Sequence, residues 1–198
     1  MGGIKPFSQS CANNREPILA ILERAFADCN QILEIGSGTG QHAVYFARAL
    51  RHLLWQPSDR RENIAGIHTW IDEEPADNLK MPLVLDVDGP WPQGSFDGFF
   101  TANTCHIMAW KSVLNMFAGI ASQARPESVL AIYGPFKYGG EFTTESNANF
   151  DLWLKSVAPH QGVRNFEDIL QAAEEAGFAF VEDNAMPANN QLLIFRKG

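Results

Sequence analysis

The chain has 198 residues, of which 45% are hydrophobic, and its 15 basic and 23 acidic residues give a net charge of −8. This length suits one domain with a full core, so we expect a single domain over residues 1–198, with a leader and first helix over residues 1–30. The negative charge disfavours nucleic acid and anionic membranes as partners, and no apolar run in the sequence is long enough to span a bilayer.

The leader combines a polar segment with an apolar helical pattern. Residues 5–14 are rich in Ser, Gln and Asn and contain Pro6, which predicts an irregular segment. Apolar residues recur at helical spacing from Ile18 to Phe26. We therefore expect a packing helix with Pro17 in its first turn, where proline is tolerated.

The most informative stretch begins at Ile32. Residues Ile32–Ile35 form a short apolar run, typical of a buried parallel strand. Gly36, Gly38 and Gly40 then predict a tight turn, and the apolar spacing after them predicts a helix that begins near Gly40. Glycines let a ligand approach the backbone, and the free N–H groups of the helix start point into the same space. The alternative is a glycine turn without a ligand.

Two further strands end near acidic residues. The run His52–Pro57 predicts a second strand, and Asp59 follows at its tip. A carboxylate at this position can accept hydrogen bonds from ribose hydroxyls, or it can cap the next helix. The run Leu83–Val87 predicts a third strand that includes Asp86. Asp86 is a second candidate ligand contact, with a simple turn acid as the alternative.

A fourth predicted strand, Phe96–Asn103, leads directly to His106. In an open α/β sheet the ligand lies outside the carboxyl ends of the strands, so Asn103 and His106 are candidate catalytic residues. His106 could act as a general base or orient a nucleophile, because the ordinary pKa of histidine is near neutral. The alternative is a histidine that is hydrogen-bonded within its loop.

The fifth predicted strand, Val129–Tyr133, opens into a polar loop that continues to Asn147. This loop should lie at the same edge of the sheet, so its side chains are candidate walls of a substrate pocket. We expect Tyr133, Phe136 and Asn147 to contact the substrate. Phe99 and Tyr138 could add aromatic surface, although Phe99 also suits the core.

The C-terminal part predicts two helices and a hairpin. Apolar residues over 150–157 and 166–173 have helical spacing, and Asn165 and Gly177 suit the ends of the second helix. Two strands, 178–183 and 191–196, flank a turn over 186–190.

Cysteines and histidines give no sign of a metal site. Cys11, Cys29 and Cys105 are odd in number and widely spaced, which argues against a disulfide frame or a zinc site. The five histidines show no metal-ligand spacing, so no metal is expected. Reduced thiols are typical of a cytoplasmic protein.

The glycine pattern carries a family resemblance. Glu34-x-Gly36-x-Gly38-x-Gly40 resembles motif I of the class I S-adenosylmethionine (SAM)-dependent methyltransferases. A dinucleotide fingerprint fits less well, because Gln41 stands where it requires its last glycine. Over its whole length the chain resembles an uncharacterised family of SAM-dependent methyltransferase-like proteins found in bacteria and animals. The matching segments are Ile32–Gly40, Gln56–Asp59, Leu85–Val87, Asn103-x-x-His106, Tyr133–Phe136, Ser146-Asn147, Phe150-Asp151 and Met186–Asn190.

This resemblance implies an α/β fold with a Rossmann-like seven-stranded sheet of order 3-2-1-4-5-7-6. Strand 7 would be antiparallel, and helices would cover both faces. The resemblance implies SAM as cofactor, with Asp86 accepting from the adenine amino group, Val87 lending its backbone N–H to the ring, and Asp88 as a rival of Asp86. The implied cofactor-binding residues are Glu34, Gly36, Gly38, Gly40, Asp59, Asp86, Val87 and Asn103.

The resemblance also implies that the leader folds over the cofactor. Gln9, Asn13, Asn14 and Arg15 are candidates for this cover. Relatives carry Glu-Arg-Asn before the first helix, where this chain has Asn13-Asn14. The arginine contact of the relatives is therefore either missing here or supplied by Arg15.

We expect a SAM-dependent methyltransferase that acts on a small-molecule acceptor. One alternative is a non-catalytic methyltransferase-like module that recognises a partner protein through the loop after the fifth strand and the 186–190 turn. The acids at Asp59 and Asp86 favour the enzyme over the module. Another alternative is an NAD-dependent oxidoreductase, which Gln41 and the lack of room for a second domain disfavour. The oligomeric state is not indicated by the sequence.

Overall fold

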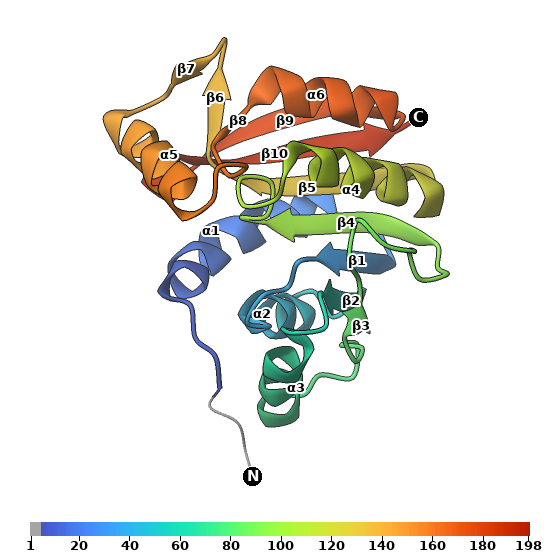
Figure 1. Cartoon of the computed structure of the whole chain (residues 1–198). Helices are drawn as coiled ribbons and strands as arrows, with labels where there is room; N and C mark the ends of the chain where they lie inside the picture. Colours follow the sequence, from blue (N-terminus) through green and yellow to red (C-terminus); the bar gives the residue numbers. More distant parts are fainter. Residues whose placement is uncertain (1–4) are drawn as a thin grey trace.

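A computed structural model describes residues 5–198, so the first four residues of the expected leader and domain lie outside the described part. Seven strands form one sheet of order β3-β2-β1-β4-β5-β10-β9, in which β10 runs antiparallel to both of its neighbours (Figure 1). This arrangement confirms the predicted order and the antiparallel seventh strand. The strands are β1 (Gln31–Ile35), β2 (Leu54–Asp59), β3 (Leu83–Val84), β4 (Phe96–Ala102), β5 (Ala124–Gly134), β9 (Phe178–Met186) and β10 (Asn190–Lys197).

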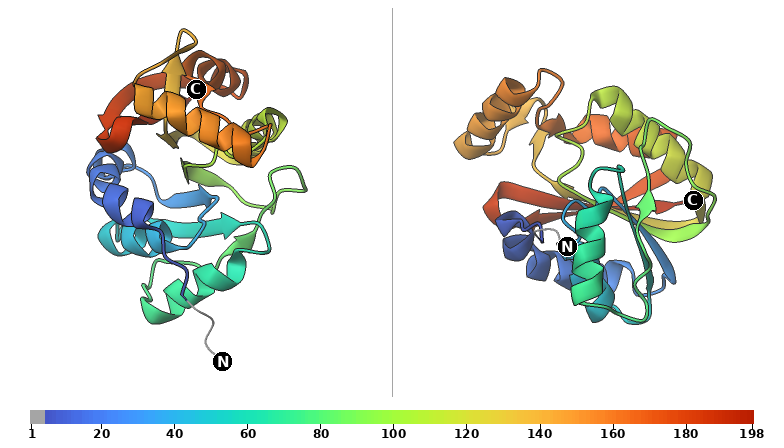
Figure 2. Two further views of the ribbon diagram at one scale, coloured as in Figure 1. Left: turned by 60° about the vertical axis from the view of Figure 1, so that its left-hand side comes forward. Right: turned by 60° about the horizontal axis from the view of Figure 1, so that its bottom comes forward.

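Helices cover both faces of this sheet, as Figure 2 shows from two further sides. The helices of the described chain are α1 (Gln9–Ala25), α2 (Gln41–Ala49), α3 (Ile64–Glu73), α4 (Trp110–Gln123), α5 (Glu145–Val157), α6 (Phe166–Glu175) and the short 3-10 helix η1 (Pro187–Asn189). Buried residues of α1, α2 and α3 share one core with the sheet, and those of α4 and α6 share another. Within the described residues, no helix is both long and apolar enough to cross a membrane.

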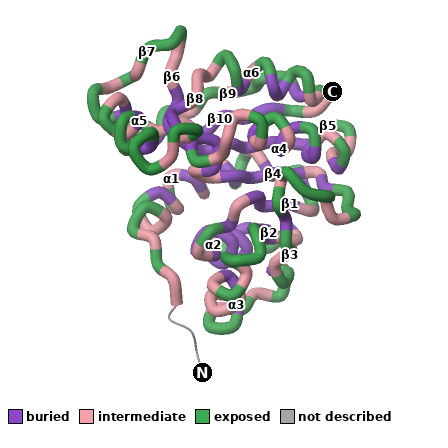
Figure 3. The backbone as a smooth tube through the Cα atoms, in the orientation of Figure 1, coloured by how far each residue is buried: buried purple, intermediate pink, exposed green. Residues whose placement is uncertain are grey.

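The two cores explain the apolar run at β1. Ile32 packs into the α1–α3 core, whereas Leu33 and Ile35 pack into the α4–α6 core. A central parallel strand that is covered on both faces needs apolar side chains at nearly every position. Figure 3 accordingly shows the middle of the sheet as buried backbone, while the outer helices carry exposed residues.

The leader differs from the sequence prediction. The segment 9–14, which was expected to be irregular, forms the first turns of α1. Ser8 caps this helix, because its Oγ accepts a hydrogen bond from the Cys11 backbone N–H at 3.3 Å. Pro17 consequently lies inside the helix instead of in its first turn, where its missing N–H leaves one intrahelical hydrogen bond unmade.

The loop after β5 also differs from the prediction. It contains β6 (Phe136–Tyr138) and β7 (Glu141–Phe142), which join β8 (Arg164–Asn165) in a second, three-stranded sheet. This small sheet forms because Phe136 is buried in the α4–α6 core, and the Tyr138 hydroxyl donates a hydrogen bond to Asp183 at 2.6 Å. The chain is thereby held so that α5 lies on the same side of the molecule as α1 (Figure 1).

The predicted third strand is shorter than expected. β3 contains only two residues, so Asp86 and Val87 lie in the loop beyond it. The predicted buried face of α5 is also smaller, because Trp153 and Val157 are exposed while Leu154 is buried.

Candidate functional site

The glycine turn between β1 and α2 needs three left-handed residues. The φ angles of Gly36, Gly38 and Gly40 are 74°, 56° and 91°. A Cβ on Gly36 would lie 2.6 Å from the Thr104 Cγ2, and one on Gly40 would lie 3.0 Å from the Ile67 Cα. A Cβ on Gly38 would meet nothing within 4 Å. Gly36 and Gly40 are thus required for packing, whereas Gly38 presents its backbone to open space.

Asp59, at the end of β2, holds this turn. One carboxylate oxygen accepts the Gly38 backbone N–H at 2.6 Å, and the other accepts the Arg60 backbone N–H at 2.7 Å and the Asn63 Nδ2 at 2.8 Å. The backbone N–H groups of Gly36 and Ser37 donate to the Ser58 carbonyl at 3.0 and 2.9 Å. The tip of β2 and the glycine turn therefore form one rigid unit.

Two adjoining cavities open beside this unit. One has a volume of ≈ 550 Å³, and we call it the acidic cavity because Asp59, Asp86 and Asp88 line it. The other has a volume of ≈ 650 Å³, and its walls come from the start of α1, the glycine turn, the ends of β4 and β5, α5 and the β9–β10 turn. We call it the neutral cavity. The residues that line both cavities are Gly36, Gly38, Ala102, Asn103 and Ile107.

Asp86 and Asp88, the two rival candidates for the adenine contact, both line the acidic cavity but differ in their hydrogen bonds. The Asp88 carboxylate accepts hydrogen bonds from the Ser112 Oγ at 2.7 Å and the Asn115 Nδ2 at 2.8 Å, and these bonds lower the pKa of Asp88. Asp88 thus anchors its loop to α4. Asp86 receives a hydrogen bond from the Asp88 backbone N–H at 3.0 Å and is exposed. Within residues 5–198, no cluster of His, Cys, Asp or Glu side chains could hold a metal ion.

The neutral cavity contains two histidines. The pKa of His42 is lowered to about 4 by burial and by the charge of Arg15. The pKa of His106 is likewise lowered to about 4, by burial and by the charge of Arg164. Both imidazoles are therefore uncharged at neutral pH. His42 Nε2 lies 2.7 Å from the Asn14 Oδ1, which can only accept, so this nitrogen carries the ring proton.

Of the predicted catalytic pair, Asn103 lies at the junction of the two cavities and His106 lies in the neutral cavity. Asn103 has a φ angle of 59°, and its backbone N–H donates to the Tyr133 carbonyl at 2.8 Å. This turn places Asn103 in the lining of both cavities. His106 lines the neutral cavity, and the ring of Phe150 meets its imidazole edge-on at a centroid distance of 5.3 Å.

Two of the three predicted substrate residues also line the neutral cavity. Burial raises the pKa of the Tyr133 hydroxyl, and hydrogen bonds with Asn14 and Asn190 oppose this effect. The Asn147 Nδ2 donates to the Thr143 Oγ1 at 3.0 Å and to the Asn189 carbonyl at 2.9 Å. Tyr133 and Asn147 thus tie the cavity walls together.

Other predicted site residues lie outside both cavities. Glu34 is buried beneath the glycine turn, where its carboxylate accepts the Trp55 indole N–H at 2.9 Å. Phe136 is 1% exposed and belongs to the α4–α6 core. Arg15 stacks over the Tyr45 ring, with its guanidinium carbon 4.6 Å from the ring centroid. Of the expected leader cover, Asn13 and Asn14 line the neutral cavity, while Gln9 donates to the Asn13 side chain at 2.9 Å.

Sequence reasoning missed several lining residues. They are Ser8, Ser10, Cys11, Thr39, His42, Phe150, Trp153 and Asn190 in the neutral cavity, and Arg60 and Asn63 in the acidic cavity. His42 was detectable, because it lies only two residues after Gly40, the last glycine of the turn. Phe150 and Trp153 looked like a packing face, because helical spacing does not show what a helix packs against.

Solved structures that resemble this chain include methyltransferases. The chain is similar to the apo form of the SAM-dependent methyltransferase SibL (TM-score 0.81, 19% identity, 95% of this chain and 55% of that chain). It is also similar to the mitomycin 7-O-methyltransferase MmcR (TM-score 0.84, 16% identity, 96% and 54%) and to PigF with SAH (TM-score 0.77, 17% identity, 92% and 61%). The chain thus has the class I methyltransferase fold and spans little more than half the length of these proteins.

A family model matches nearly the whole chain. The match covers residues 5–197, and the family is described as "Protein of unknown function (DUF938)". The matched region includes every element of the sheet and both cavities. The chain therefore belongs to the DUF938 family.

Proposed function

We propose that this protein is a SAM-dependent methyltransferase that acts on a small-molecule acceptor. The observation that supports this proposal is the position of Gly38. Its backbone is open to space and lines both the acidic cavity and the neutral cavity, at the carboxyl edge of the sheet. The similarity of the fold to SAM-dependent methyltransferases, and the structure of one neighbour with SAH, support it.

The residues around Gly38 fit the parts of SAM. The Asp59 carboxylate would accept one hydrogen bond from a ribose hydroxyl, since three protein donors leave about one of its four lone pairs free, on Oδ2. Asp86 and Val87 would hold the adenine ring, because Asp88 is already committed to α4. The amino-acid end would lie in the neutral cavity beside Gly36 and Asn14. Glu34 and Gly40 would act indirectly, by shaping the glycine turn.

The chemistry requires the chain to align an acceptor and exclude water. SAM supplies a sulfonium methyl group that is electrophilic without further activation. Asn103, at the junction of the cavities, would orient the acceptor toward the site of transfer. The uncharged imidazole of His106 would accept a hydrogen bond from the acceptor and orient it, because a pKa of about 4 makes this ring a weak base at neutral pH. Tyr133 and Asn147 would fix the wall against which the acceptor lies.

The test compares two glycine variants in calorimetric titrations with S-adenosylhomocysteine (SAH). Gly38 and Gly139 have nearly equal φ angles, 56° and 58°, and an added Cβ at either position meets nothing within 4 Å. Gly38→Ala and Gly139→Ala should therefore lose similar stability, about 1 kcal/mol each, through backbone strain. Only the Cβ of Gly38→Ala would project between the cavities, so only this variant should lose SAH affinity, by about tenfold or more.

Wild-type protein that fails to bind SAH or SAM would overturn the proposal. Equal SAH affinity in the two variants would show that the ligand does not lie against the glycine turn. Asp86→Ala provides an independent test of the adenine contact. Asp86 is exposed and its side chain accepts a single protein hydrogen bond, so its removal should disturb the fold little. This variant should fold normally and weaken SAH binding if Asp86 contacts the adenine.

A further inference from the structure

The neutral cavity differs from the rest of this acidic chain in its lack of charge. Among the described residues that line it, none is Asp, Glu, Lys or Arg. Its polar side chains are hydroxyls, amides, the Cys11 thiol and two imidazoles. The adjoining acidic cavity, by contrast, contains three aspartates and Arg60. The residues that line both cavities therefore lie between a lining with charged side chains and a lining without them.

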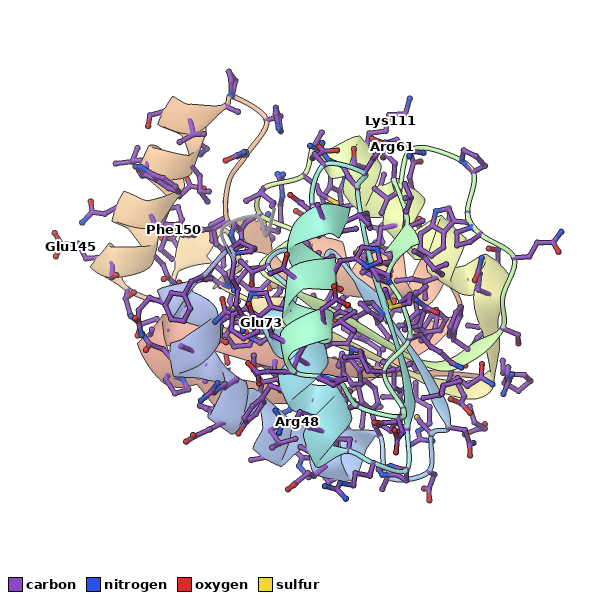
Figure 4. All side chains as sticks on the ribbon, turned by 90° about the horizontal axis from the view of Figure 1, so that it is seen from below. Arg48, Arg61, Glu73, Lys111, Glu145 and Phe150 are labelled. Carbon is purple, nitrogen blue, oxygen red and sulfur yellow. The ribbon has the colours of Figure 1, made fainter. Side chains whose placement is uncertain are left out.

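Aromatic rings form the wall of the neutral cavity at α5. The rings of Trp153 and Phe150 stack with a centroid distance of 5.7 Å and an interplanar angle of 16°. The Phe150 ring in turn meets the imidazole of His106 edge-on. Figure 4 labels Phe150 on α5, at the margin of the molecule. Trp153 remains 58% exposed although it lines the cavity, so part of its surface is free to contact a ligand.

In the part of the neutral cavity between α5 and the β9–β10 turn, away from Gly36 and Asn14, these features select against a charged methyl acceptor. A carboxylate, phosphate or ammonium group placed between α5 and the β9–β10 turn would lose water and find no side chain of opposite charge. A flat ring, in contrast, could stack on or meet edge-on the rings of Phe150 and Trp153. A hydroxyl on that ring could be satisfied by the imidazole of His106 or the amide of Asn103.

We propose that the neutral cavity takes an uncharged, flat aromatic compound that bears a hydroxyl group. This inference rests on the proposed function and names the class of its methyl acceptor. The hydroxyl oxygen forms a new bond to the methyl carbon, while the electron pair of the broken methyl–sulfur bond stays on sulfur. The imidazole of His106 accepts a hydrogen bond from the hydroxyl and orients it, and the hydroxyl proton is released to water as the new bond forms. The products are a methyl ether and SAH.

The test measures binding of two probes that differ in charge. The full chain, saturated with SAH at pH 7.5, is titrated with 2-naphthol and with 6-hydroxy-2-naphthoate, and binding is followed by ligand-observed NMR. Both probes carry the same ring system and hydroxyl, but only the second is an anion. We expect 2-naphthol to bind at least about tenfold more tightly, because the carboxylate would be desolvated without a partner.

Two matched pairs of variants locate the binding surface on α5. Ser146 lines the neutral cavity and Asn149 does not, and both are exposed residues of the same helix. Ser146→Lys should therefore improve the affinity for 6-hydroxy-2-naphthoate relative to 2-naphthol, whereas Asn149→Lys should leave the ratio unchanged. Trp153→Ala should weaken 2-naphthol binding about tenfold, whereas Leu152→Ala, at a 67% exposed neighbour outside the cavity, should not.

The outcomes separate this inference from the proposed function. If SAH binds but the naphthoate binds as tightly as 2-naphthol, the inference is wrong and the proposed function stands. If SAH binds and Trp153→Ala leaves 2-naphthol binding unchanged, the ring does not lie against α5 and the inference is equally wrong. If SAH does not bind, the proposed function fails, whatever the naphthol result.

Discussion

The Glu34 carboxyl is buried beneath the glycine turn, where water cannot reach it. The pKa of Glu34 is raised to about 7, chiefly by burial and also by the nearby charge of Asp59, while hydrogen bonds from Trp55 and Ser37 oppose the rise. In the unfolded chain the same carboxyl has its ordinary pKa of 4.5. The folded state therefore holds a proton on Glu34 that the unfolded state has lost between these two pH values.

We predict that Glu34→Gln changes the pH dependence of stability. Because the folded pKa is raised, the contribution of Glu34 is fully present below pH 4.5 and is lost as the pH rises to about 7. The loss should be on the order of 3 kcal/mol for a shift of this size. The glutamine amide is uncharged throughout and can still accept the Trp55 N–H. In urea unfolding, the variant should therefore gain stability relative to wild type between pH 5 and pH 8.

The control for this prediction is Glu23→Gln, which removes an exposed acid from the face of α1. Its free energy of unfolding should differ from that of wild type by a nearly constant amount across the same pH range. A constant difference for Glu34→Gln as well would mean that Glu34 is ionised in the folded protein at neutral pH.

Individual positions differ in how far the sequence alone could define them. Asp59 could be predicted, because an acid at the tip of a second strand lies beside the glycine turn in any sheet of this kind. The different environments of Gly38 and Gly40 could not, because they depend on Ile67, which is distant in the sequence. The pKa values of His42 and His106 likewise follow from tertiary burial, which the sequence does not display.

At the scale of elements, two side chains, those of Gln41 and Trp70, hold the leader in place. The Gln41 Oε1 accepts the Ser8 backbone N–H at 2.5 Å, and its Nε2 donates to the Ser8 carbonyl at 3.3 Å. Trp70 supports the same segment, because its indole N–H donates to the Pro6 carbonyl at 2.7 Å. Gln41, where a dinucleotide fingerprint would have glycine, thus positions the start of α1 as a wall of the neutral cavity.

We predict that Gln41→Ala loosens α1 at its start. The variant leaves the backbone N–H and carbonyl of Ser8 without their side-chain partner, which should cost about 1–3 kcal/mol. Amide hydrogen exchange over residues 9–14 should become faster, and SAH binding should weaken several-fold because Asn13 and Asn14 lose their fixed position. Gln171→Ala, at an exposed glutamine of α6, is the matched control and should change neither quantity. Unchanged exchange at the start of α1 would show that Gln41 does not hold the leader.

The strands were easier to predict than the segments around them. Apolar runs identify β1, β4 and β5 because both faces of a central parallel strand are buried. The β6–β7 region looked like a loop, because short strands interrupted by Gly139 and Gly140 lack a clear alternation. The helical start of α1 was missed because Ser8, a good cap, stands among residues that also favour turns.

At the scale of the whole molecule, the cavities lie where distant parts of the chain meet. Asn14 near one end and Asn190 near the other line the neutral cavity together with Tyr133. α5 is tied to the β9–β10 turn by the hydrogen bond from Asn147 to the Asn189 carbonyl. A ligand in these cavities would contact segments from most of the sequence, so its binding should stabilise the fold as a whole.

We predict that SAH raises the temperature of unfolding of the entire chain. A ligand that binds only the folded state at a hundred times its dissociation constant adds about 2.7 kcal/mol, which for a chain of this size corresponds to roughly 5–10 °C. Differential scanning calorimetry should show this shift as a single transition in wild type and in Gly139→Ala, and a shift about half as large or smaller in Gly38→Ala, whose SAH affinity is weakened about tenfold or more. NAD should give no shift, because Gln41 is engaged with Ser8 at the position where a dinucleotide fingerprint requires glycine. A shift with NAD and none with SAH would favour the oxidoreductase hypothesis over the methyltransferase.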